Sequence, residues 1–176
     1  MYAEEPVIRV RATKKLLDRL PLVVGRSNGT PASHLGDWYA TVVFSRPNLV
    51  LLVNELTLIP VLAPFAPSSS LLRRVPGEFA IALDDYGVPG DFIGMVVDGS
   101  KEIELDKTAS RSILGVMNDY VQVMKRFRFD PGHPRDRLLM ASRLAETPTR
   151  PLFDREGSPD RELMATVARW DASRNH

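Results

Sequence analysis

The segment from Lys107 to Arg128 carries the longest amphipathic pattern in the sequence and constrains the fold more than any other stretch. Its apolar residues recur at the spacing that places side chains on one face of an α-helix. They are Leu114, Met117, Val121 and Met124, widened by Ile113, Tyr120 and Phe127. We therefore predict a helix over residues 110–128 whose apolar face is buried, with the other elements packed around it.

The start of this helix combines features that suit an anion. Thr108 or Ser110 can cap the helix, while Lys107 and Arg111 stand where a helix N-terminus usually prefers acidic residues. Backbone N–H groups, hydroxyls and cations together can bind a phosphate or a similar anion. A basic helix start that meets only water is the simpler interpretation, and both stay open.

The polar face of the same helix contains Gly115 and Asn118. A glycine in mid-helix costs about 0.5–1 kcal/mol relative to alanine. Its presence suggests either close packing by a neighbouring element or the approach of a ligand. Asn118 follows one turn later on this stripe, so it joins the candidate binding residues.

Composition bounds the class of protein. With 176 residues, 44% of them hydrophobic and 26% charged, the chain is expected to form a single domain over 1–176, frayed at 1–6 and 171–176. No apolar run approaches the ~20 residues that a membrane span needs, and no secretory signal is visible. The absence of cysteine excludes disulfides and is compatible with a cytoplasmic location.

Local patterns predict an α+β fold, with a mainly antiparallel sheet covered by helices. Alternating or continuous apolar residues indicate strands at 7–13, 37–45, 49–53, 56–62 and 102–105. The run 49–53 should lie at the centre of the sheet, and Pro60 should restrict its strand to an edge. Capping and proline signals indicate helices at 14–20, 77–86, 90–98, 135–145 and 159–170.

Most chemical motifs are absent from the sequence. His34, His133 and His176 lack metal-ligand spacing, so we predict no metal site, and the pair Asp84 and Asp85 fits a solvated helix face. No glycine-rich phosphate loop, dinucleotide fingerprint or nucleophile elbow occurs. We therefore expect no cofactor.

Several stretches carry a family resemblance. They are Thr13-Lys-Lys-Leu-Leu, Asp37-Trp-Tyr-Ala, Val53-Asn-Glu-Leu-Thr-Leu and Lys107-Thr-Ala-Ser-Arg-Ser-Ile-Leu-Gly-Val-Met-Asn-Asp. The chain resembles an uncharacterised bacterial family that carries a domain-of-unknown-function label, over most of its length. The resemblance implies a small cytoplasmic bacterial domain, and some relatives are associated with plasmid-borne open-reading-frame domains. It implies no activity.

Three functions remain open. The leading hypothesis is a binding or regulatory module with an anion or phosphate site formed by Lys14, Lys15, Lys107, Thr108, Ser110, Arg111 and Asn118. An enzyme of phosphoryl transfer or hydrolysis, acting on a nucleotide or nucleic acid, would use Asn118, Asp119 and His34. The third is a protein-interaction domain. Nucleic acid is a further possible partner, through a basic helix carrying Arg135, Arg137 and Arg143.

Overall fold

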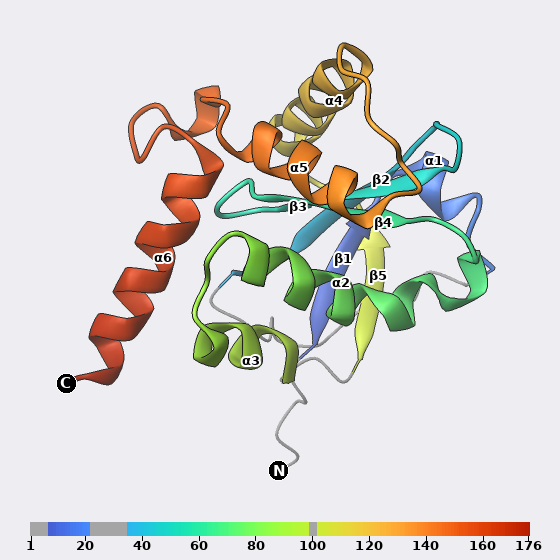
Figure 1. The fold of residues 1–176 in the computed structure, drawn as a ribbon. Coiled ribbons are helices and arrows are strands. Elements are labelled where there is room, and N and C mark those ends of the chain that lie inside the picture. The colour runs from blue at the N-terminus through green and yellow to red at the C-terminus, as the bar shows by residue number, and fades with distance from the viewer. Residues whose placement is uncertain (1–6, 22–34, 99–101) are drawn as a thin grey trace.

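The computed structural model describes residues 7–21, 35–98 and 102–176, and a five-stranded sheet lies at its centre (Figure 1). The strands follow the spatial order β4-β3-β2-β1-β5. Their bounds are β1 Ile8–Ala12, β2 Trp38–Val43, β3 Leu49–Asn54, β4 Pro60–Pro64 and β5 Ile103–Lys107. The strand carrying Pro60 lies at an edge, as predicted, whereas β2 and not β3 occupies the centre.

The sheet is mixed, which corrects the prediction of a mainly antiparallel one. Strands β2, β3 and β4 form the predicted antiparallel meander. Strand β1, however, runs parallel to both of its neighbours, with Ala12 opposite Ala40 of β2 and Lys107 of β5. Sequence periodicity shows which residues share a strand face but carries no information on the direction of the partner strand, so this part of the prediction was wrong.

Helices of two kinds, α and 3-10, complete the fold. The α-helices are α1 Lys14–Leu17, α2 Leu71–Asp85, α3 Gly90–Asp98, α4 Arg111–Lys125, α5 Pro134–Ala145 and α6 Pro159–Arg174. Short 3-10 turns occur at Ser68–Ser70 and Arg150–Leu152. None of the helices within the described ranges is both long enough and apolar enough to cross a membrane.

The helices cover both faces of the sheet (Figure 1). Alternation along β2 sends Trp38, Ala40 and Val42 to one face, where they join the larger core cluster with residues of α2, α3 and α6. Tyr39 and Val43 point to the other face and pack with α4 and α5. The helix at 111–125 therefore covers one face only, and the remaining elements are organised around the sheet rather than around this helix.

Two helices differ from their predictions for a tertiary reason. Pro76 was expected to begin a helix but lies inside α2, where its ring removes one backbone hydrogen bond. Tertiary contacts anchor the turn before Pro76: Arg74 donates to the carbonyls of Pro64, Phe65 and Pro67, and Leu71 and Val75 are buried. In α5, the sequence predicts Leu138, Leu139 and Leu144 on the buried face; Leu144 is buried, whereas Leu139 is 57% exposed and Met140 is buried.

Candidate functional site

The candidate site lies where three strands of the sheet end and two helices begin. We call this side of the sheet, formed by the carboxyl ends of β1, β2 and β5, the carboxyl edge. Because β1 is parallel to β2 and β5, all three end at this edge, and α1 and α4 begin directly after β1 and β5. The hydroxyl oxygens of Thr13 and Thr41 are 2.9 Å apart there and form a hydrogen bond. The carboxyl ends of parallel strands are the usual place for ligand sites in sheets covered on both faces.

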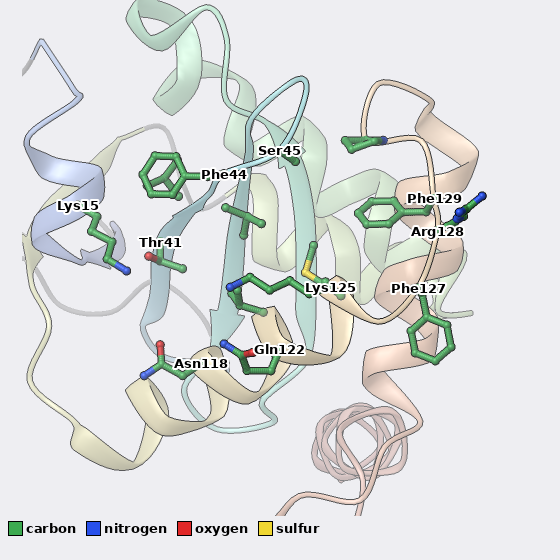
Figure 2. Close-up of a pocket in the computed structure, with 15 residues that line it drawn as sticks. Lys15, Thr41, Phe44, Ser45, Asn118, Gln122, Lys125, Phe127, Arg128 and Phe129 are labelled. Atoms are coloured by element: carbon green, nitrogen blue, oxygen red, sulfur yellow. The ribbon is translucent and has the colours of Figure 1, made fainter.

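A pocket of about 650 Å³ opens beside this edge, between β2 and α4 (Figure 2). Its volume lies within the range of small-molecule sites, roughly 300–1,000 Å³. The pocket is bordered by the first turn of α1, the end of β2 with its following turn, one face of α4 and the loop after α4. The lining residues are Lys15, Thr41, Val42, Val43, Phe44, Ser45, Asn118, Val121, Gln122, Met124, Lys125, Phe127, Arg128, Phe129 and Pro131.

The charge of the pocket is one-sided. Lys15 and Lys125 direct their ammonium groups into the hollow from α1 and α4, and Arg128 stands at the margin and extends away from it (Figure 2). None of the described residues that line the pocket is acidic. The neighbouring Lys14, by contrast, has an acidic partner: its ammonium group is 2.8 Å from the carboxylate of Asp18. The pocket lysines therefore present positive charge that no lining residue neutralises.

Neutral polar groups lie between these cations. Asn118 and Gln122 stand one helical turn apart on α4 and point into the same hollow as Lys15 (Figure 2). Neither carboxamide has a hydrogen-bond partner among the described residues. Ser45, by contrast, donates its hydroxyl to the carbonyl of Pro47 at 2.7 Å. The two amides are thus available donors and acceptors.

Aromatic and aliphatic side chains form the remaining walls. Val121 and Phe129 are half-buried and Met124 is buried. Phe44 is 57% exposed at the rim. The pocket therefore combines cations and amides with apolar surface.

The first turn of α4 is capped by a side chain of the protein itself. The Ser110 hydroxyl accepts from the backbone N–H of Ile113, so it caps the helix as predicted. The hydroxyl of Tyr39 lies near the backbone N–H groups of Ala109 and Ser110. Burial raises the pKa of Tyr39, and the Arg11 guanidinium and these N–H groups offset the rise only in part. The Tyr39 phenol thus lies just before the first turn of α4, near the backbone of the N-cap residue.

The predicted binding residues divide into two groups. Lys15 and Asn118 line the pocket. The other five predicted residues lie around the same edge of the sheet but do not line the pocket. They are Lys14, Lys107, Thr108, Ser110 and Arg111. Strand alternation places Lys107 on the face of buried Leu105, opposite the face that α4 covers. Of the predicted residue set, therefore, only Lys15 and Asn118 line the hollow, and a ligand at any of these residues stays a prediction.

No described residue packs closely against Gly115 on α4. A Cβ atom added there would meet no neighbouring atom within 4 Å. Of the two alternatives, close packing by a described residue is therefore excluded, and the approach of a ligand to this stripe stays a prediction.

The residues considered for an enzyme are not assembled in the described part of the chain. Asp119 is exposed and does not line the pocket with Asn118. His34 lies outside the described residues. Within 7–21, 35–98 and 102–176, no group of three or more His, Cys, Asp or Glu side chains could hold a metal ion.

Several pocket residues were missed from the sequence, and some of them carried a signal. Gln122 and Lys125 follow Asn118 at four and seven residues, and the sequence places them on or beside the same polar stripe, but they were not included among the candidate binding residues. Ser45 and Phe129 belong to turns far apart in the sequence. No local pattern joins them, because only folding brings these turns to the same hollow.

The chain is thus an α+β protein with a mixed sheet, covered on both faces, and a basic pocket beside the carboxyl ends of its parallel strands. Residues 9–162 match the family described as a domain of unknown function, DUF6933, and the chain belongs to that family. This confirms the resemblance to an uncharacterised family and includes every pocket residue. Comparisons with curated proteins and with solved structures gave no match.

Proposed function

We propose that this protein is a binding or regulatory module that holds a phosphate-containing or other anionic ligand in the pocket between β2 and α4. The observation that carries the proposal is the pocket's charge: two lysines point into it, an arginine stands at its margin, and no described lining residue is acidic. The anion then lies beside the middle of α4 rather than at its N-terminus.

Electrostatics favours an anion in such a place. Like charges gathered in a cleft with low-dielectric walls raise the local potential and concentrate ligands of opposite charge. Hydrogen bonds from an ammonium group to a phosphate oxygen are about twice as strong as those between neutral groups. A bound anion would also relieve the repulsion between Lys15 and Lys125.

Binding is favoured over catalysis by the lining residues. The described lining contains neither a carboxylate nor an imidazole that could act as a general base. A hydrolase or phosphoryl transferase needs a group that activates the attacking oxygen. We further propose a bacterial, cytoplasmic protein, in keeping with the resemblance and with a chain that contains no cysteine.

The adjacent residues Lys14 and Lys15 provide a matched test. We expect about 20 mM inorganic phosphate to raise the melting temperature of the wild type above that in sodium chloride of equal ionic strength, as binding linkage requires. Lys15→Ala and Lys125→Ala should lose this difference, whereas Lys14→Ala should keep it because Lys14 pairs with Asp18 outside the pocket.

General salting-out by phosphate affects all variants alike, so the comparison isolates the pocket. Equal responses of the Lys14 and Lys15 variants, or a wild type that does not distinguish phosphate from chloride, would contradict the proposal.

A further inference from the structure

We infer that the ligand of this pocket is an adenine nucleoside monophosphate. The inference rests on the proposed anion binding and adds the chemistry of the rest of the ligand. Three features of the pocket carry it: a pair of unpartnered carboxamides, apolar walls that include aromatic rings, and lysines without carboxylates.

The carboxamides of Asn118 and Gln122 can bind a ligand edge that carries both a hydrogen-bond donor and an acceptor. Each amide offers an N–H donor beside a carbonyl acceptor. Adenine presents the complementary pair, its N6 amino group beside N7, and Asn and Gln are the side chains that match this edge in two hydrogen bonds. Guanine presents two acceptors on the corresponding edge, so the amides discriminate between the two purines.

The apolar walls suit a flat ring. Phe129 and Phe44 border the hollow (Figure 2), and Val121 of α4 adds an aliphatic surface to its lining. Stacking of a base on an aromatic side chain contributes to binding whatever the base, because every base has a π-face. Stacking of the base on the aromatic rings therefore contributes affinity, while the amides provide selectivity for adenine over guanine.

The lysines suit a monophosphate. Lys15 points toward the hydroxyl of Thr41, and Lys125 approaches from α4 (Figure 2). Together they provide ammonium and hydroxyl groups for one phosphate. A nucleoside triphosphate is usually held through Mg²⁺ and one or two protein carboxylates. Since the described lining offers no carboxylate, the pocket is better matched to a single phosphate group.

A long-chain anionic amphiphile fits less well. Its apolar tail would cover Asn118 and Gln122 without offering them hydrogen bonds, and an unpaired buried amide is costly. The neutral polar groups between the lysines thus argue for a polar ring and sugar rather than a hydrocarbon chain.

The inference is tested by calorimetric titration of the full chain with five probes: AMP, GMP, adenosine, ribose 5-phosphate and decyl phosphate. We expect AMP to bind most tightly, with affinity at least about tenfold above that of GMP, the discrimination of one two-bond base contact. Adenosine and ribose 5-phosphate should each bind at least about tenfold more weakly than AMP, because each lacks one half of the recognised chemistry.

Variants separate the two halves of the site. In Asn118→Ala and in Gln122→Ala, the affinity for AMP should fall about five- to tenfold, and the affinity for ribose 5-phosphate should stay unchanged. Lys15→Ala should lower the affinity for AMP and for ribose 5-phosphate, and should leave the affinity for adenosine unchanged. Asp119→Ala and Arg126→Ala serve as matched controls, because Asp119 is exposed on α4, Arg126 is exposed at its C-cap, and neither lines the pocket.

The possible failures are distinguishable. Ribose 5-phosphate or GMP binding as tightly as AMP, or decyl phosphate binding more tightly, would overturn the adenine inference while leaving anion binding intact. Adenosine binding as tightly as AMP would overturn the role of the lysines, and with it the proposed function. Absence of binding by all five probes would overturn both.

Discussion

Asn54 is fully buried at the end of β3, and its side chain holds the turn into β4 together. Its amide donates to the carbonyl of Leu35 at 2.7 Å, and its carbonyl oxygen accepts from the backbone N–H groups of Leu56 and Thr57. A buried polar side chain that lost these partners would cost the free energy of desolvation without compensation. One residue thus joins the start of β2 to the β3–β4 turn.

Glu78 yields a prediction on pH. It lies on α2, where burial raises the pKa of its carboxyl, and Arg137 and Arg74 offset the rise only in part. A raised pKa means that the folded state binds more protons than the unfolded state, so stability falls as the pH rises from the ordinary carboxyl pKa through the folded value. We expect Glu78→Gln to raise the urea midpoint at pH 7.

The pH dependence provides the control for Glu78. The gain should shrink as the pH falls below the ordinary carboxyl pKa, because wild-type Glu78 is then protonated in both states. Glu146→Gln, at an exposed position, should change stability by less than ~0.5 kcal/mol at either pH. A lower midpoint for Glu78→Gln at pH 7 would show that its attraction to the two arginines outweighs desolvation.

At the scale of elements, α4 shows how the packing partner sets the rotation of a helix. Met117 and Met124 are buried, as the apolar spacing predicted. The centre of the buried face, however, also contains Val116, while Leu114 and Val121 are only half-buried. The helix is thus turned slightly from its predicted phase, and Val121 lies where the core cluster under α4 meets the pocket.

This phase predicts an order of stability among variants. Met117→Asp should destabilise the protein by about 4 kcal/mol or unfold it, because it buries a charge without a partner. Leu114→Asp should cost less than Val116→Asp, and Asp119→Ala should stay within ~0.5 kcal/mol. Urea denaturation measures all four variants. Equal costs for the Leu114 and Val116 substitutions would contradict the observed rotation.

At the scale of the molecule, the basic segment after α4 is partly used inside the fold. Arg137 is buried to 9% exposure and donates to the carbonyl of Pro131 at 2.9 Å. The Arg143 guanidinium lies 4.1 Å from the centroid of the Phe127 ring. Of the three arginines predicted as phosphate contacts on α5, Arg137 is therefore committed to packing, which weakens the hypothesis of a nucleic-acid interface there.

Nucleic-acid binding is accordingly expected to be weak. A net charge of +1 adds little long-range attraction for a polyanion. Fluorescence anisotropy with labelled single- and double-stranded DNA and RNA should give Kd values weaker than about 10 µM at ~0.15 M salt, the range of non-specific contacts. Submicromolar binding that weakens steeply with added salt would instead support a phosphate interface.

Local sequence patterns were sufficient to predict the features that depend on neighbouring residues. Alternation along residues 8–12 and 38–43 placed their side chains on the correct faces, and Pro60 marked the edge strand. The bounds of α3 and the Ser110 cap followed from local signals. Each of these depends on periodicity or on backbone hydrogen bonds within a few residues, which a sequence shows directly.

Only the tertiary structure decided which distant segments meet. The parallel pairing of β1 with β5 unites Ala12 and Lys107 across most of the chain, and no local pattern specifies a partner or its direction. The same holds for the pocket, where Lys15 from α1, Ser45 from a turn and Gln122 from α4 face one hollow. Long-range packing selects these neighbours by burying apolar surface on both faces of the sheet, so the candidate site emerged only with the fold.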